Sequence, residues 1–211
     1  MKNILIENLI RRIKTNILNE SVFDKYATSI TKIIVKAFKN KKDVSELFVL
    51  ERGGEEAEFE VNVKFVESKN MDDSYDISGS AGDEDIDIKI KYNPKYFPKV
   101  MNDFVSEIKE TIVHELEHIG QHNFEDMHIQ SKKTKNNFEY LISDKEVPAY
   151  VKGLIARANR SKKTLSSVMD EWFEENKKKF DNPKKEWKIV KDVWMSWAKE
   201  KRNQSKIKKF N

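Results

Sequence analysis

The clearest signal in the sequence is the stretch Ile112-Val113-His114-Glu115-Leu116-Glu117-His118-Ile119-Gly120. It lies within residues 103–122, where apolar side chains recur every three or four positions: Val105, Ile108, Ile112, Leu116 and Ile119. This spacing puts the apolar side chains on one face and predicts an amphipathic helix.

His114 and His118 are four residues apart, so they share one face of the predicted helix. Two imidazoles at this spacing can hold one tetrahedral Zn²⁺ ion. Glu115, next to the first ligand, is placed to take a proton from a metal-bound water and pass it to a leaving amine. The pattern H-E-x-x-H fixes only three positions, but its place inside a periodic helix is the context that the motif requires. The sequence therefore predicts a catalytic zinc site here.

A catalytic zinc needs a third protein ligand, and Glu146 is the candidate we favour. It opens the next predicted helix, residues 144–158, where the small residue Ala149 would allow close packing against the metal-bearing helix. The alternative is a capping box, in which Ser143 and Glu146 would bond to backbone N–H groups and occupy the carboxylate.

His122 and His128 are the other candidates for the third ligand. His122 is eight residues after His114, about 12 Å along a straight helix, and could reach the same ion only if the helix broke at Gly120. His128 would have to return from a polar loop.

Three further residues near the motif receive weaker predictions. Tyr150 follows Glu146 by one turn and could hydrogen-bond a zinc ligand or stabilise an oxyanion, although packing in the core is the alternative we favour. Glu117 is expected on a solvated helix face, and Gln121 has no evident function.

The segments Ile112–Gln121, Tyr140-Leu141 and Glu146–Tyr150 together resemble the zincin-like metallopeptidases of the gluzincin type. The similarity is greatest to compact single-domain forms, including those encoded by bacteriophages, and covers roughly residues 85–158. It implies His114, His118 and Glu146 as zinc ligands, Glu115 as general base, and a protein or peptide substrate. It also implies an edge strand that binds extended peptide beside the metal, here residues 85–92.

The rest of the chain fits an α+β fold with a small mixed or antiparallel sheet. Alternating apolar and polar residues predict half-buried strands at 57–67 and 85–92. A further strand is expected at 45–51, and the polar stretch 68–84, with Gly79 and Gly82, is expected to be a loop. Helices are expected at 3–18, 22–39, 164–180 and 184–202.

Composition limits the function classes. Cysteine is absent, which excludes disulfide scaffolds, cysteine-ligated metals and cysteine nucleophiles. No apolar run approaches the roughly 18 residues of a membrane span, and Met1–Leu18 has helical spacing rather than the continuous apolar core of a signal peptide. We therefore expect a cytoplasmic location without a membrane partner.

Charge divides the chain into two parts. Residues 160–211 contain 16 basic and 8 acidic residues, a net charge of +8, whereas residues 1–159 carry −4. We therefore expect a zincin-like catalytic domain over 1–159 and a basic helical segment with several tryptophans over 160–211. Nucleic acid is a less favoured partner of that segment, because tryptophans at helical spacing usually pack in a core. A non-catalytic binding or assembly protein on the same scaffold is the alternative function.

Overall fold

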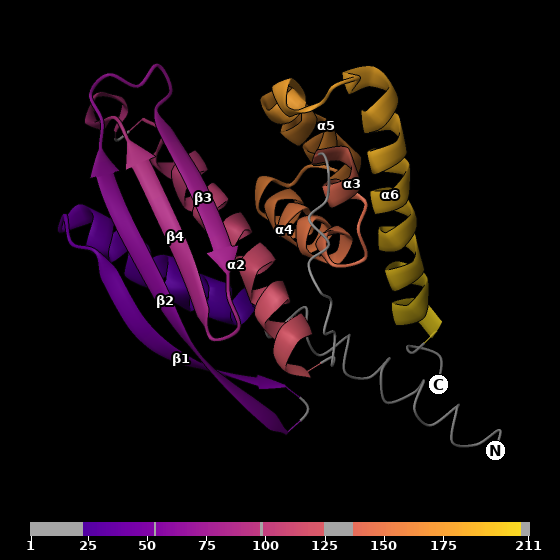
Figure 1. Cartoon of the computed structure of the whole chain (residues 1–211), viewed down its shortest axis with the longest axis horizontal. Helices are drawn as coiled ribbons and strands as arrows, with labels where there is room; N and C mark the ends of the chain where they lie inside the picture. The colour runs from indigo at the N-terminus through magenta and orange to yellow at the C-terminus, as the bar shows by residue number, and fades with distance from the viewer. Residues whose placement is uncertain (1–22, 53, 98, 125–136, 208–211) are drawn as a thin grey trace.

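A four-stranded mixed sheet forms one half of the molecule in the computed structural model, which describes residues 23–52, 54–97, 99–124 and 137–207, with side chains as far as residue 200 (Figure 1). The strand order is β1-β2-β4-β3, with β1/β2 and β3/β4 antiparallel and β2/β4 parallel. The strands are β1 (Val44–Arg52), β2 (Glu55–Glu67), β3 (Tyr75–Ala81) and β4 (Asp85–Tyr92). The predicted strands at 45–51, 57–67 and 85–92 are thus confirmed.

Two predictions for the sheet are wrong. The expected loop 68–84 contains β3. Its alternate positions Ile77, Gly79 and Ala81 include a single large apolar side chain, so the sequence shows no clear apolar alternation. Because β3 pairs along the outer side of β4, residues 85–92 lie inside the sheet, and the edge next to the helical half is β3.

Helices make up the other half of the molecule and also cover the inner face of the sheet. A helix over residues 23–39 packs on the sheet, and the long helix α2 lies between the sheet and the remaining helices (Figure 1). The predicted helices at 22–39 (described from residue 23), 103–122, 144–158 and 184–202 occur, and the one predicted at 164–180 occurs as α5 followed by a 3₁₀ turn, whereas 3–18 lies outside the described residues. The bounds are α2 (Met101–Phe124), α3 (Asn137–Leu141), α4 (Glu146–Ser161), α5 (Leu165–Asn176) and α6 (Pro183–Ile207), with 3₁₀ turns η1 (Pro94–Tyr96) and η2 (Lys177–Lys179).

Two apolar clusters stabilise these halves. The first joins the inner face of the sheet to residues 23–39 and α2, and includes Phe59, Ile88 and Ile112. The second joins α3, α4, α5 and α6 around Trp194, which is fully buried and donates its indole N–H to the Leu141 carbonyl. The tryptophans at helical spacing in α6 thus contribute to a core.

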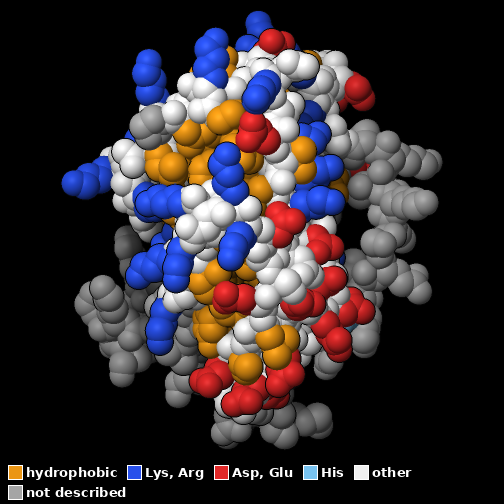
Figure 2. All heavy atoms as spheres, turned by 90° about the vertical axis from the view of Figure 1, so that its left-hand side faces the viewer, with side chains coloured by type: hydrophobic (Ala, Val, Ile, Leu, Met, Phe, Trp, Pro, Cys, Tyr) orange, Lys and Arg blue, Asp and Glu red, His pale blue; other side chains and the backbone are white. Residues whose placement is uncertain are grey.

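The outer side of the sheet is open to solvent. β1 exposes Leu47 and Val49 there. On the side of the molecule that Figure 2 shows, Lys and Arg side chains gather toward the top and left and acidic side chains toward the bottom and right, with apolar patches within both regions. None of the helices that the structure describes is long and apolar enough to cross a membrane.

Candidate metal centre

Three ligand atoms from two helices converge where α2 meets α4. The Nε2 atoms of His114 and His118 are 3.1 Å apart, and each lies 3.4 Å from Oε2 of Glu146. Zinc binds nitrogen at roughly 2.0–2.1 Å and carboxylate oxygen at about 2.0–2.2 Å, so neighbouring ligands in a tetrahedral site are about 3.3–3.5 Å apart. The observed triangle therefore has the size that one tetrahedral zinc ion requires.

The Glu146 carboxylate is directed at the histidines and not at the helix end. The Ser143 hydroxyl does accept a bond of 3.4 Å from the Glu146 backbone N–H, which is half of a capping box. In a complete capping box the Glu146 carboxylate would accept from the Ser143 backbone N–H. Here that N–H donates to the Tyr140 carbonyl instead. Oε2 of Glu146 is buried and makes no hydrogen bond that meets normal geometry, and a metal ion would satisfy it.

The surroundings of the cluster favour the anionic form of the Glu146 carboxylate. Burial acts to raise the pKa of Glu146, but the interactions with His114 and His118 outweigh it and lower that pKa to about 2. For His118, burial acts to lower the pKa, and the contact with Glu146 reverses this and raises it. The donor set of two imidazoles and one carboxylate is one that catalytic zinc sites use.

Glu115 lies beside this triangle and is buried, with 5% of its surface exposed. A carboxylate oxygen of Glu115 lies within 4.8 Å of a ring nitrogen of each histidine, so Glu115 could itself reach a metal ion held by the two histidines. Burial raises the pKa of Glu115, and the two histidines offset this rise only in part. A buried carboxylate with a raised pKa beside the two histidines is also suited to act as a general base.

Gln121 fixes the orientation of His118, which sequence reasoning did not anticipate. Its amide N–H donates to the Lys145 carbonyl at 3.0 Å, which leaves Oε1 to accept from His118 Nδ1 at 3.1 Å. A proton on Nδ1 leaves Nε2 with a free lone pair that points at the other two ligand atoms. The sequence signal was the spacing of one helical turn from His118.

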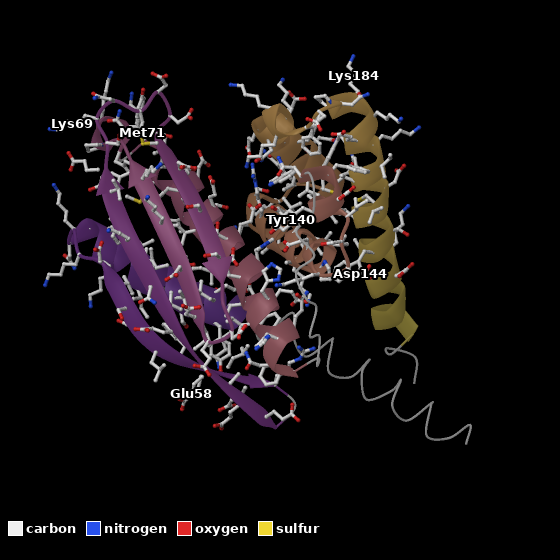
Figure 3. All side chains as sticks on the ribbon, viewed as in Figure 1. Glu58, Lys69, Met71, Tyr140, Asp144 and Lys184 are labelled. Atoms are coloured by element: carbon white, nitrogen blue, oxygen red, sulfur yellow. The ribbon has the colours of Figure 1, made fainter. Side chains whose placement is uncertain are left out.

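Two tyrosines lie against the ligands. The Tyr150 ring meets the His114 ring edge-on with centroids 4.5 Å apart, and stacks on Trp194 at 5.3 Å. It therefore packs in the aromatic core while also lining the cleft beside the metal centre. Tyr140, at the junction of the two halves in Figure 3, was missed from the sequence; burial and Glu146, including a side-chain hydrogen bond, raise its pKa.

The alternative third ligands are not part of this cluster. His122 Nε2 lies 3.5 Å from Oδ1 of Asp83, and its side chain is 38% exposed. α2 continues unbroken through Gly120 to Phe124, so His122 stays on a later turn of the helix. His128 lies outside the described residues. Glu117 is also not solvated as expected, because it is buried and bonded to Lys152 of α4 at 2.6 Å.

A cleft of about 480 Å³ opens over the ligands, between the edge strand β3 and the helices α2, α4 and α5. Gly79 of β3 passes so close to α2 that an added Cβ would lie 2.7 Å from Oε1 of Glu115 and 2.7 Å from Cγ2 of Thr111. Gly79 thus allows the edge strand to run directly beside the predicted base.

Comparisons of the chain with family models, curated proteins and solved structures return no match.

Proposed function

We propose that the protein is a zinc-dependent peptidase with a zincin-like fold. The observation that carries this proposal is the triangle formed by His114, His118 and Glu146, whose ligand atoms have the mutual distances of a tetrahedral zinc site. The open cleft above the triangle supports catalysis over a purely structural site, because a catalytic zinc keeps one position for water or substrate.

The residues around the triangle fit hydrolysis of an amide bond. Zinc, when bound, would supply a Lewis acid that polarises a carbonyl and makes water more acidic. Glu115 would accept the proton of the attacking water and then donate it to the leaving nitrogen. Burial of Glu115 supports the second step, since a raised pKa makes the carboxyl a better proton carrier near neutral pH.

The edge strand supports a polypeptide as the substrate. β3 pairs with β4 on one side only, so its other side offers backbone N–H and C=O groups along the cleft. An extended peptide can add to such an edge by β-augmentation, which would bring its backbone over Glu115. In this proposal β3 takes the place that the sequence interpretation gave to residues 85–92.

The test is hydrolysis of a mixed peptide library by zinc-loaded protein, with Glu115→Gln as the informative variant. We expect Glu115→Gln to keep about one zinc per chain and to lose hydrolysis by at least about 100-fold, the usual contribution of a general base. The matched control is Glu58→Gln, an exposed carboxylate of β2 on the far part of the sheet (Figure 3). Equal activity of Glu115→Gln and wild type would refute the mechanism, and a wild type that binds no zinc would refute the proposal as a whole.

A further inference from the structure

The outer face of the sheet carries its charged side chains in two separate groups. On each strand these side chains alternate with the core positions, and no described helix covers them. Figure 3 labels Glu58 and Lys69 at opposite ends of the sheet, near one group each. The acidic group, toward the turn between β1 and β2, consists of Glu51, Glu56, Glu58, Glu60, Asp85 and Asp87, and the basic group consists of Lys64, Lys89 and Lys91.

The strand register places like charges next to one another. Glu60 of β2 lies opposite Asp85 of β4, and Lys64 lies opposite Lys89, so repulsion acts within both groups. The outward Asp76 of β3 is the exception, because it lies beside the basic group. Among the residues that the structure describes, no member of either group forms an ion pair. Opposite charges supplied from outside would therefore relieve the repulsion at each end of the face.

A second copy of the chain fits this face, because its negative end and its positive end are complementary to each other. A two-fold axis that lies in the face and crosses the strands places the negative end of each copy over the positive end of the other. With the axis between Asp87 and Lys89, Asp87 of one copy meets Lys89 of the other, and Asp85 meets Lys91. A uniformly charged partner, such as nucleic acid, would instead be attracted to one end and repelled by the other.

The face is large enough for a reversible dimer. A strand residue occupies about 3.3 by 4.8 Å of a sheet, so the four strands present roughly 600 Å². Two copies would bury about 1,200 Å² in total, which is the lower end of the range for specific interfaces. Leu47, which is 66% exposed on the same face, adds apolar area. Because most of the contact is between charges, the association should weaken as salt is added.

We infer that the outer face of the sheet is the interface of a two-fold symmetric dimer of this chain. In this dimer Asp85 and Asp87 of each copy face Lys91 and Lys89 of the other. The inference does not depend on the proposed zinc chemistry.

The experiment is analytical ultracentrifugation of the full chain over a micromolar concentration series, at low and high salt, with zinc and again with chelator. We expect a monomer–dimer equilibrium that salt weakens and that is the same with zinc and with chelator. Asp85→Lys/Asp87→Lys makes the outward side of β4 entirely positive, and Lys89→Asp/Lys91→Asp makes it entirely negative. Each variant alone should dimerise at least about 100-fold more weakly than wild type, because like charges then meet across the interface.

Mixing the two charge-reversal variants is the decisive step. All the reversed charges then face opposite charges, so the mixture should form a heterodimer about as stable as the wild-type dimer. Two variants that had merely lost their fold would not restore each other. The matched control is Asp181→Lys/Asp192→Lys, the same charge change at exposed positions of the helical half, which should dimerise like wild type.

Several outcomes would overturn the inference. A wild type that stays monomeric throughout the series excludes the dimer. Reversal variants that dimerise like wild type would assign the contact to another surface, such as the open edge of β1, and a dimer that requires zinc would assign it to the metal. A mixture that stays monomeric would show that the face does not pair with itself and would leave a different protein as its partner.

Discussion

Gln121 is a residue outside the proposed ligand set that we expect to affect metal binding. It holds His118 through Nδ1 and is itself held by the Lys145 carbonyl, so it links α2 to the residue before α4. We expect Gln121→Ala to weaken zinc affinity by about 10- to 100-fold, because His118 loses the acceptor that fixes its tautomer and ring orientation. Competition with a fluorescent chelator would measure this.

The control for this prediction is Asn123→Ala. Asn123 lies two residues on and bonds to the carbonyls of Ile119 and Asp83, without contact to His118. If the two variants lost the same zinc affinity, the effect would come from the end of α2 and not from the orientation of His118.

Glu110 should make the free energy of unfolding fall as pH rises, which is opposite to the effect of most carboxylates. A pKa raised from 4.5 to about 7 means that the folded state holds this proton more tightly than the unfolded state. The contribution of Glu110 to the free energy of unfolding is therefore complete below pH 4.5 and is lost as pH rises toward 7, by up to roughly 3 kcal/mol.

We expect Glu110→Gln to remove this loss, since the amide stays neutral. Urea unfolding of metal-free protein at pH 4.5 and pH 8 would show it: the variant should gain stability relative to wild type between the two values. Glu171→Gln serves as the comparison, and a Glu110→Gln difference that does not change with pH would contradict the prediction.

Spacing along the chain was enough to predict which residues the structure brings together at the candidate site, but not the contacts that depend on packing between helices. His114, Glu115 and His118 were predicted from their spacing over one helical turn. Glu146 was predicted because a catalytic zinc site needs a third protein ligand. The bond from Gln121 to the Lys145 carbonyl and the contacts of Tyr140 form only when α3 and α4 dock on α2, so no local pattern could indicate them. The ion pair of Glu117 was hidden for the same reason, because Lys152 is 35 residues away.

At the scale of elements, the helices and the long strands could be predicted because each has one apolar face that repeats along the chain. β3 could not be predicted in this way, because its glycine and small residues let it pass close to α2 but contribute little apolar area. Gly79 suggested a loop by composition, whereas in the structure it is the residue that lets an edge strand pass Glu115.

This position of Gly79 gives a prediction for β3 as an element. In Gly79→Val the new side chain would collide with Glu115 and with Thr111 of α2, so either β3 or the Glu115 carboxylate must move. We expect hydrolysis to fall by at least about tenfold while zinc content stays near wild type, because a small misplacement of a catalytic group is costly.

Gly82→Val is the matched control for the strand. The atom that its Cβ would meet first is Oδ1 of Asp85, the end of a flexible side chain. A Gly79→Val protein as active as Gly82→Val would show that β3 does not constrain Glu115.

At the scale of the whole molecule, the proposed metal ligands come from elements that belong to two different apolar clusters. His114 and His118 lie on α2, whose apolar face belongs to the cluster with the sheet, whereas Glu146 begins α4, which packs in the cluster around Trp194. Other links between α2 and α4 include the Glu117–Lys152 ion pair and the close approach of Gly153 to the Glu110 carbonyl. A metal ion bound here would therefore hold the sheet layer and the helical layer together.

We expect zinc to raise the melting temperature of the whole chain. Ligand at 1,000 times its Kd adds about 4 kcal/mol to the free energy of unfolding. For a chain of this length each kcal/mol corresponds to about 2–4 °C, so the expected increase over chelator-treated protein is roughly 8–16 °C. Differential scanning calorimetry in zinc and in chelator would measure it, and one common transition should move if the two clusters unfold together.

His114→Ala and Glu146→Ala should lose the increase and His122→Ala should keep it, because His122 lies against Asp83 and away from the ligand triangle. An increase that survives Glu146→Ala but disappears in His122→Ala or His128→Ala would instead assign the third ligand to that histidine.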